Sequence, residues 1–259
     1  MRNHLWIAIA AAVLGAAAPA AAAPPPAKPT IVLVHGAFAD GSSWNGVIAD
    51  LQRDGYTVIA AANPLRGIAS DATYVASVVK SVHGPVVLVG HSYGGAVISQ
   101  AGAAAGNVKS LVYVDGFALD VGESIGETGA RFPAIPLGAA LISAPLPDGG
   151  QDIYVRPDQF GVVFAPDLPP ASVQLAAAEQ RPVAAVAFSE KPTAAAWKTL
   201  PSWFVYGSAD LAIHPAELAF MAERAHSRKT VVIPGGSHVT LLSHPHEVAS
   251  LIEEAATAP

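Results

Sequence analysis

Cysteine is absent from the 259 residues, and charged residues are scarce. Without a thiol the chain cannot form a disulfide, use a cysteine nucleophile, build a cysteine-ligated zinc site or carry a cysteine-linked lipid anchor. Only 13% of the residues are Asp, Glu, Lys or Arg, and the acidic ones outnumber the basic ones, for a formal charge of −6. A chain of this charge lacks the basic patch that a phosphate backbone requires, so we expect no nucleic-acid partner.

The N-terminal residues have a composition of their own. Arg2 supplies a positive charge, an apolar run covers residues 5–18, and small residues with A-x-A spacing follow. This order is typical of a secretory signal peptide, which we assign to residues 1–22, followed by a Pro/Ala-rich leader at 23–29. The apolar run is shorter than the roughly 20 residues that span a bilayer, so we expect no stable membrane anchor. The sequence therefore predicts a secreted or periplasmic protein.

From residue 30 onward, short apolar stretches alternate with stretches typical of helices. Hydrophobic residues make up 52% of the sequence, as in a compact globular domain. The predicted strands are 30–35, 57–61, 86–89, 109–115, 203–206 and 231–233, and the predicted helices are 44–53, 70–82, 92–105, 215–225 and 246–256. Nearly continuous apolar strands between helices predict a mostly parallel, doubly wound α/β sheet covered on both faces.

The alternation stops between about residues 118 and 200. Stretches such as RFPAIPLG and APDLPP are rich in proline, and only 171–179 and 193–198 have helical character. An insertion of this length inside a doubly wound domain is typical of a cap over a functional site. We therefore predict a single α/β domain at 30–259 with a cap at about 118–200.

The segment VLVGHSYGGAV, residues 87–97, places Ser92 between a predicted strand and a predicted helix. A G-x-S-x-G pattern in this position is typical of a nucleophile elbow, a strained turn that holds a serine hydroxyl above the sheet. Gly90 and Gly94 suit the turn, since a Cβ at either position would crowd it or the neighbouring strand. Ser92 is therefore the predicted nucleophile.

Two later strands end at residues that such a serine needs. Asp210 follows SWFVYG and His238 follows VVIPGG, and open parallel sheets carry their chemistry beyond these strand ends. His238 is the predicted general base for the hydroxyl of Ser92. Asp210 is predicted to fix the tautomer of the histidine ring and to stabilise the imidazolium.

An oxyanion formed in such a site needs two fixed N–H donors. The backbone N–H of Tyr93, at the start of a predicted helix, is one candidate. The other is Ala37 in HGAF, in the loop after the first strand. We expect no metal and no cofactor, because the three histidines of SHVTLLSHPHE have no carboxylate placed to complete a metal site.

Several residues compete for these roles. Asp115 also ends a predicted strand and is the alternative acid. Four histidines compete with His238. We expect His244 and His246 to flank the last helix and His91 to be buried and structural. We expect His214 to be a loop residue that at most touches the substrate.

Four segments carry a family resemblance: IVLVHGAFADGSSW, VLVGHSYGGAV, PSWFVYGSAD and GGSHVTLLSHP. The chain resembles the α/β-hydrolases that include plant methyl salicylate esterases, hydroxynitrile lyases and many bacterial esterases. The resemblance implies an α/β-hydrolase fold with a cap insertion and a triad of Ser92, Asp210 and His238. It also implies an oxyanion hole built from the amides of Ala37 and Tyr93.

Departures from the family pattern narrow the expected activity. The plant hydroxynitrile lyases have threonine and lysine where this chain has Gly36 and Val239, so no cation is present to hold a leaving cyanide. A serine nucleophile also argues against a dehalogenase or an epoxide hydrolase. The alternatives are a cofactor-free perhydrolase, similar to haloperoxidases, a hydroxynitrile lyase, which these departures disfavour, and a non-catalytic ligand receptor.

The expected function is therefore a serine hydrolase acting on a small-molecule partner. It would cleave carboxylic esters of small to medium, mostly apolar substrates through an acyl-enzyme intermediate, because the cap segment is poor in charge. The aromatic residues that could line an acyl pocket, or alternatively pack within the cap, are Phe117, Phe160, Phe164, Phe188 and Trp197.

Overall fold

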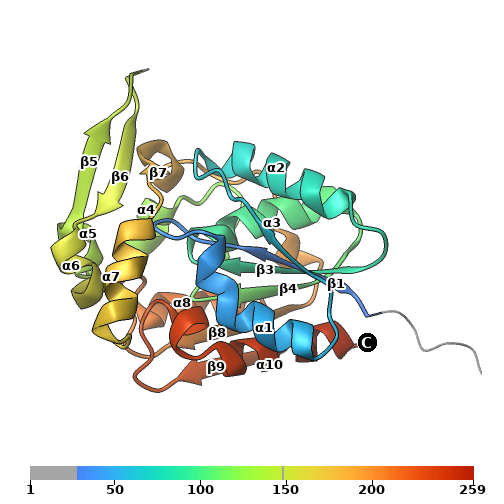
Figure 1. The fold of residues 1–259 in the computed structure, drawn as a ribbon. Helices are drawn as coiled ribbons and strands as arrows, with labels where there is room; N and C mark the ends of the chain where they lie inside the picture. The colour runs from blue at the N-terminus through green and yellow to red at the C-terminus, as the bar shows by residue number, and fades with distance from the viewer. Residues whose placement is uncertain (1–27, 148) are drawn as a thin grey trace, which may run out of the picture.

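The computed structural model describes residues 28–147 and 149–259. The predicted signal peptide and residues 23–27 of the leader lie outside the described residues. Figure 1 shows a central sheet between layers of helices, with a smaller group of strands and helices beside it. In the part of the chain that the structure describes, no helix is long and apolar enough to cross a membrane.

The central sheet has six strands in the order β2-β1-β3-β4-β8-β9, all of them parallel. Strands β3 and β8 are buried along their whole length, as expected when helices cover both faces of a sheet. The predicted doubly wound parallel sheet is confirmed. The strand bounds are β1 Thr30–Val34, β2 Val58–Ala61, β3 Val86–His91, β4 Val108–Val114, β8 Ser202–Gly207 and β9 Lys229–Ile233.

Helices pack on the two faces of this sheet. Helices α1 and α10 contact each other on one face, and α2 and α3 contact each other on the opposite face (Figure 1). The bounds are η1 Gly41–Trp44, α1 Asn45–Arg53, α2 Ile68–Lys80, α3 Tyr93–Ala105, α8 Pro215–Arg224, α9 Thr240–Ser243 and α10 Pro245–Thr257.

Helix α2 begins earlier than the sequence predicted. Its N-cap is Gly67, so the prediction that a helix starts at Ser70 was wrong. The carboxylate of Asp71 accepts a hydrogen bond of 3.0 Å from the backbone N–H of Arg66 and one of 2.8 Å from the hydroxyl of Tyr93. The first residue of α3 is thereby tied to the start of α2.

The segment between β4 and β8, which we call the cap, is more regular than predicted. It contains an antiparallel sheet of three strands, β5 Leu141–Pro145, β6 Gln151–Val155 and β7 Val183–Ala184, and β5 and β6 extend away from the body (Figure 1). The sequence did not predict this sheet, because its glycine and proline residues suggest a continuous irregular segment. Gly149 and Gly150 lie in the short connection between β5 and β6. The helical pieces are α4 Ile125–Gly129, α5 Leu137–Ala140, α6 Pro157–Val163, α7 Pro170–Glu179, η2 Ala185–Phe188 and η3 Ala196–Lys198.

Candidate active site

Ser92 lies at the turn between β3 and α3 in an unusual backbone conformation. Its φ of 51° and ψ of −123° fall in a region that residues with a Cβ rarely occupy. The N–H of Ser92 donates to the carbonyl of Val114 (3.2 Å), and its carbonyl accepts from the N–H groups of Gly95 (2.9 Å) and Phe117 (3.1 Å). Hydrogen bonds on both sides of the peptide unit thus hold the serine in this strained turn.

Two glycines make the turn possible because backbone atoms approach them closely. A Cβ at Gly90 would lie 2.5 Å from the carbonyl oxygen of Gly94, and a Cβ at Gly94 would lie 2.5 Å from the carbonyl oxygen of Val34. Both distances are shorter than any real Cβ contact, so only glycine fits between β1, β3 and α3.

The structure brings together Ser92, Asp210 and His238, which come from three different strand ends. The Nε2 atom of His238 lies 2.8 Å from Oγ of Ser92, and Nδ1 lies 2.7 Å from Oδ2 of Asp210. The other carboxylate oxygen of Asp210 accepts from the N–H groups of Ala212 (2.7 Å) and Ile213 (2.9 Å). These bonds orient the carboxylate toward the imidazole.

The surroundings of His238 favour its protonated form. Burial by itself lowers the pKa of His238, because a charged imidazolium loses its hydration. The charge of Asp210 and its hydrogen bond to the ring, together with the charge of Asp115, act in the opposite direction and raise the pKa of His238 above its usual 6.5.

Asp115, the alternative acid, lies deeper and contacts other groups. Its Oδ1 accepts from the N–H of Gly207 (2.9 Å), and its Oδ2 accepts from the N–H (3.2 Å) and the hydroxyl (2.5 Å) of Thr240. Burial raises the pKa of Asp115 to about 8, and the charge of Asp210 adds to this effect. The geometry therefore brings Asp210 rather than Asp115 to the imidazole, while Asp115 ties the end of β8 to α9.

The two predicted oxyanion donors lie on the same cavity wall as the serine and the histidine. Ala37 and Tyr93 both line this cavity of about 270 Å³. Tyr93 is the first residue of α3, where a backbone N–H has no acceptor within its own helix and the helix dipole favours negative charge. In the loop after β1, the N–H of Phe38 donates to the carbonyl of Arg181 in the cap (3.1 Å), which fixes the loop that contains Ala37.

The cap supplies much of the cavity wall. Phe117, Phe164 and Phe188 lie there, as expected for an apolar pocket. Phe160 lines a neighbouring cavity of about 290 Å³. Trp197 lines neither cavity, because it packs at the base of the cap with its indole N–H donating to the carbonyl of Leu119 (2.9 Å).

Sequence reasoning missed other residues of the cavity wall, because most of them lie in the cap, whose short elements no periodicity predicts, and two lie after β8, in the loop before α8 and in its first turn. Most of them are aliphatic: Ile125, Ile135, Leu137, Leu141 and Ile213. One is an acid, Glu217, in the first turn of α8.

The competing histidines have other contacts. The ring of His91 is buried with Nε2 2.9 Å from the carbonyl oxygen of His238, and burial holds the pKa of His91 well below 6.5. His214 is the N-cap of α8, and its Nδ1 accepts from a backbone N–H at 3.1 Å. His246 contacts the carboxylate of Asp50 on α1. Among residues 28–147 and 149–259, no three His, Asp or Glu side chains are grouped so as to hold a metal ion.

Comparisons with known proteins agree with this architecture. An α/β hydrolase nvfD of Aspergillus novofumigatus is 27% identical over 249 residues, which cover 88% of this chain and 97% of the relative. A carbendazim-hydrolysing esterase of a Nocardioides species is 33% identical over 109 residues, which cover 36% of this chain and 44% of that enzyme. The crystal structure of polyneuridine aldehyde esterase has a TM-score of 0.77 at 18% identity and covers 88% of this chain and 99% of its own.

The family model described as "Alpha/beta hydrolase family" matches residues 31–251. This range includes the central sheet except its first residue, Thr30, together with the cap and the three strand ends that meet at Ser92. The chain belongs to the alpha/beta hydrolase family.

Proposed function

We propose that the protein is a serine hydrolase that cleaves carboxylic esters of small to medium, mostly apolar substrates. One observation carries the proposal: the imidazole of His238 contacts the hydroxyl of Ser92 with one nitrogen (2.8 Å) and the carboxylate of Asp210 with the other (2.7 Å). A serine hydroxyl becomes a strong nucleophile when an oriented base can take its proton.

The proposed reaction has two halves. In the first, Oγ of Ser92 attacks the ester carbonyl carbon while Nε2 of His238 takes the hydroxyl proton. The bond to the alcohol oxygen then breaks, and the departing alcohol receives that proton from Nε2. In the second half, water attacks the acyl-serine with His238 as the base, and the acid leaves as Oγ regains its proton.

Negative charge develops on the carbonyl oxygen in both halves. The amides of Ala37 and Tyr93 are the proposed donors to this oxygen, since both line the cavity beside the serine. In a cavity closed by apolar side chains these hydrogen bonds are stronger than in water, because little solvent screens them. Asp210 stabilises the imidazolium that exists while the proton is in transit.

Two further observations support this function, one on the size of the substrate and one on the reaction. The cavity of about 270 Å³ is lined mainly by aliphatic and aromatic side chains, so it suits a small apolar group. Two of the similar proteins are named as esterases, the carbendazim-hydrolysing enzyme and polyneuridine aldehyde esterase.

The decisive experiment compares the wild type with Ser92→Ala on p-nitrophenyl esters of increasing acyl length and on aryl esters. We expect kcat to fall by roughly 10⁴ to 10⁶ in the variant, with an unchanged circular dichroism spectrum. A fluorophosphonate probe should label the wild type and not the variant. Retention of more than about a tenth of the activity, or labelling at another residue, would contradict the assignment of Ser92 as nucleophile.

We also propose that the protein works outside the cytoplasm, because residues 1–22 have the order of charges and apolar residues typical of a signal peptide. Expression of the full chain in a bacterial host, followed by N-terminal sequencing of the periplasmic fraction, tests this proposal. A mature N-terminus after Ala20 or Ala22 is the expected result, and an uncleaved cytoplasmic chain would contradict it.

A further inference from the structure

Glu217 is an acid in a cavity whose wall is otherwise mainly apolar. It lies in the first turn of α8, only 3% exposed, and lines the same cavity as Ser92 and His238. Apart from the serine, the histidine and the tyrosine of the proposed catalytic machinery, every other side chain on that wall is aliphatic or aromatic, or belongs to glycine. The proposed hydrolytic reaction does not use this carboxyl group.

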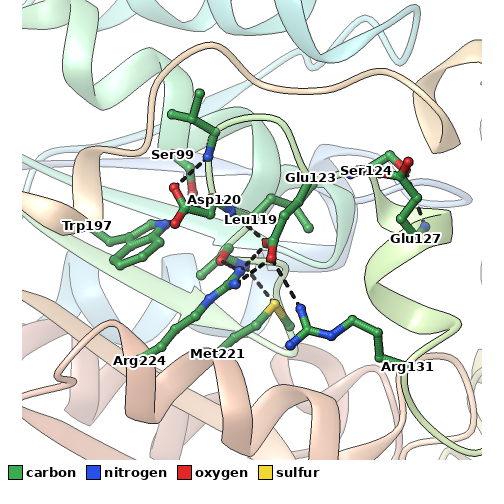
Figure 2. Close-up of polar contacts among 12 residues, drawn as sticks. Ser99, Leu119, Asp120, Glu123, Ser124, Glu127, Arg131, Trp197, Met221 and Arg224 are labelled. Atoms are coloured by element: carbon green, nitrogen blue, oxygen red, sulfur yellow. Dashed lines mark hydrogen bonds and ion pairs between the residues drawn. The ribbon is translucent and has the colours of Figure 1, made fainter.

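The carboxyl group of Glu217 has no hydrogen-bond partner within the described part of the chain. Its Oε1 atom is buried without one. The two arginines whose charge reaches it, Arg131 and Arg224, are both engaged by Glu123, as Figure 2 shows. Arg224 donates to the two carboxylate oxygens of Glu123 at 2.8 and 2.7 Å, and Arg131 donates to one of them at 3.2 Å.

Helix stabilisation does not explain the position of this side chain. An acid in the first turn of a helix interacts favourably with the helix dipole, but an exposed acid does so without losing its hydration. Glu247 in the first turn of α10 is such an exposed acid. A buried polar group without a partner destabilises the fold, so an unpartnered acid facing a ligand cavity points to a partner that arrives with the ligand.

We propose that Glu217 determines substrate specificity by hydrogen bonding to a hydroxyl group on the otherwise apolar acyl or alcohol part of the ester. This inference rests on the proposed ester hydrolysis and names its substrate class, a hydroxylated small ester. The contact is separate from the reacting carbonyl, which lies at Ser92.

The charges around Glu217 explain why a hydroxyl suits it better than a cation. Burial raises the pKa of Glu217 to about 7, and the charges of Asp210 and Glu123 act in the same direction, against Arg131 and Arg224. Near neutral pH the group is therefore present in both protonation states. A hydroxyl can donate to the carboxylate and accept from the carboxylic acid, whereas an ammonium group pairs only with the carboxylate.

The test uses pairs of esters that differ only in a hydroxyl or a methyl group at the chain end. One pair, methyl 6-hydroxyhexanoate and methyl heptanoate, carries the difference on the acyl side. The other pair, 4-hydroxybutyl acetate and pentyl acetate, carries it on the alcohol side. The ratio of kcat/KM within each pair is measured for the wild type, Glu217→Gln, Glu217→Leu and the control Glu247→Gln.

We expect the wild type to prefer the hydroxylated ester by about tenfold or more in one of the two pairs, because its methyl analogue leaves a buried polar group unpaired. The pair that shows the preference identifies which part of the ester reaches Glu217. Glu217→Leu should shift that ratio by at least about tenfold toward the methyl ester, while Glu217→Gln, whose amide oxygen still accepts, should keep a preference for the hydroxyl. Glu247→Gln should leave both ratios unchanged.

Ratios in Glu217→Leu equal to those of the wild type in both pairs would overturn the inference. A changed melting temperature alone would then assign Glu217 to helix stability. Failure of the proposed hydrolysis itself looks different, because no ester would turn over in the wild type. In that case calorimetric binding of the same four esters to the wild type and to Glu217→Leu supplies the ratios, and equal ratios again overturn the inference.

Discussion

The carboxylate of Asp167 in the cap accepts two hydrogen bonds from Ser237, one from its N–H (2.9 Å) and one from its hydroxyl (2.5 Å). Ser237 immediately precedes His238, so a residue of the cap holds the loop that carries the histidine. The cap is thereby connected to the proposed chemistry as well as to the binding cavity.

This relationship predicts that the cap affects turnover. Asp167→Ala leaves the loop at Ser237 without its acceptor, and we expect kcat/KM for a p-nitrophenyl ester to fall roughly ten- to hundredfold because the imidazole is misplaced. Asp158→Ala is the matched control, because among the described residues that exposed carboxylate has polar contacts only with the side chains of Arg156, the N-cap of α6, and Gln159. Equal kinetics in the two variants would show that the cap does not position His238.

Substitution of the two buried carboxylates near His238 should affect different properties, the turnover rate for Asp210 and the stability for Asp115. Asp210→Asn should lower kcat by roughly 10⁴, because an amide cannot hold the imidazole tautomer or stabilise the imidazolium. Asp115→Asn should leave kcat within about tenfold and lower the free energy of unfolding by about 1–3 kcal/mol, since its amide NH₂ would face one of the donors of Gly207 or Thr240. Steady-state kinetics and urea unfolding measure the two effects, and the reverse ranking would move the acid to Asp115.

The sequence could predict which side chains meet at the site because the signals are local and the sheet converts them into proximity. Gly90 and Gly94 are required because backbone atoms of the turn and of the adjacent strand β1 approach them closely. Strands β3 and β8 end at the same edge of a parallel sheet, which brings their following residues together. The choice between Asp210 and Asp115 depended on loop conformation, which no residue pattern specifies.

The cap could not be predicted in the same detail. Strands β5 and β6 pair with each other as a hairpin across a connection rich in proline and glycine, and the strand propensity of their residues alone does not predict this pairing. Glu217 resembles any surface acid of a helix in the sequence, because α8 has an amphipathic pattern and begins with proline. Its burial depends on the approach of α4, where a Cβ at Gly129 would lie 3.8 Å from Oε2 of Glu217, and only the three-dimensional structure reveals this approach.

The proposed mechanism predicts that activity does not depend on a metal ion. In that mechanism the two backbone amides at Ala37 and Tyr93 would supply the electrophile, and the imidazole of His238 would supply the base. Prolonged dialysis against EDTA should therefore leave kcat/KM within experimental error of the untreated protein. Loss of activity that added Zn²⁺ restores would contradict this assignment of the electrophile.

The last prediction concerns pH. His238 acts as a base only when it is neutral, so activity should rise with pH and level off above the pKa of His238. An unperturbed histidine has a pKa of about 6.5. In the structure the charge and hydrogen bond of Asp210 outweigh burial and raise the pKa of His238, so the midpoint of kcat/KM against pH should lie above 6.5.

The Asp210→Asn variant is the internal control for this profile. It removes the carboxylate charge that raises the pKa of His238 and leaves the burial that lowers it, so the midpoint of its residual activity should move to lower pH. Rates across pH 5 to 9, at saturating and at low ester concentration, separate the free protein from the ester complex. An unchanged midpoint in Asp210→Asn would show that the group titrating in the profile is not His238. The next group to test would then be Glu217, because burial raises its pKa to about 7.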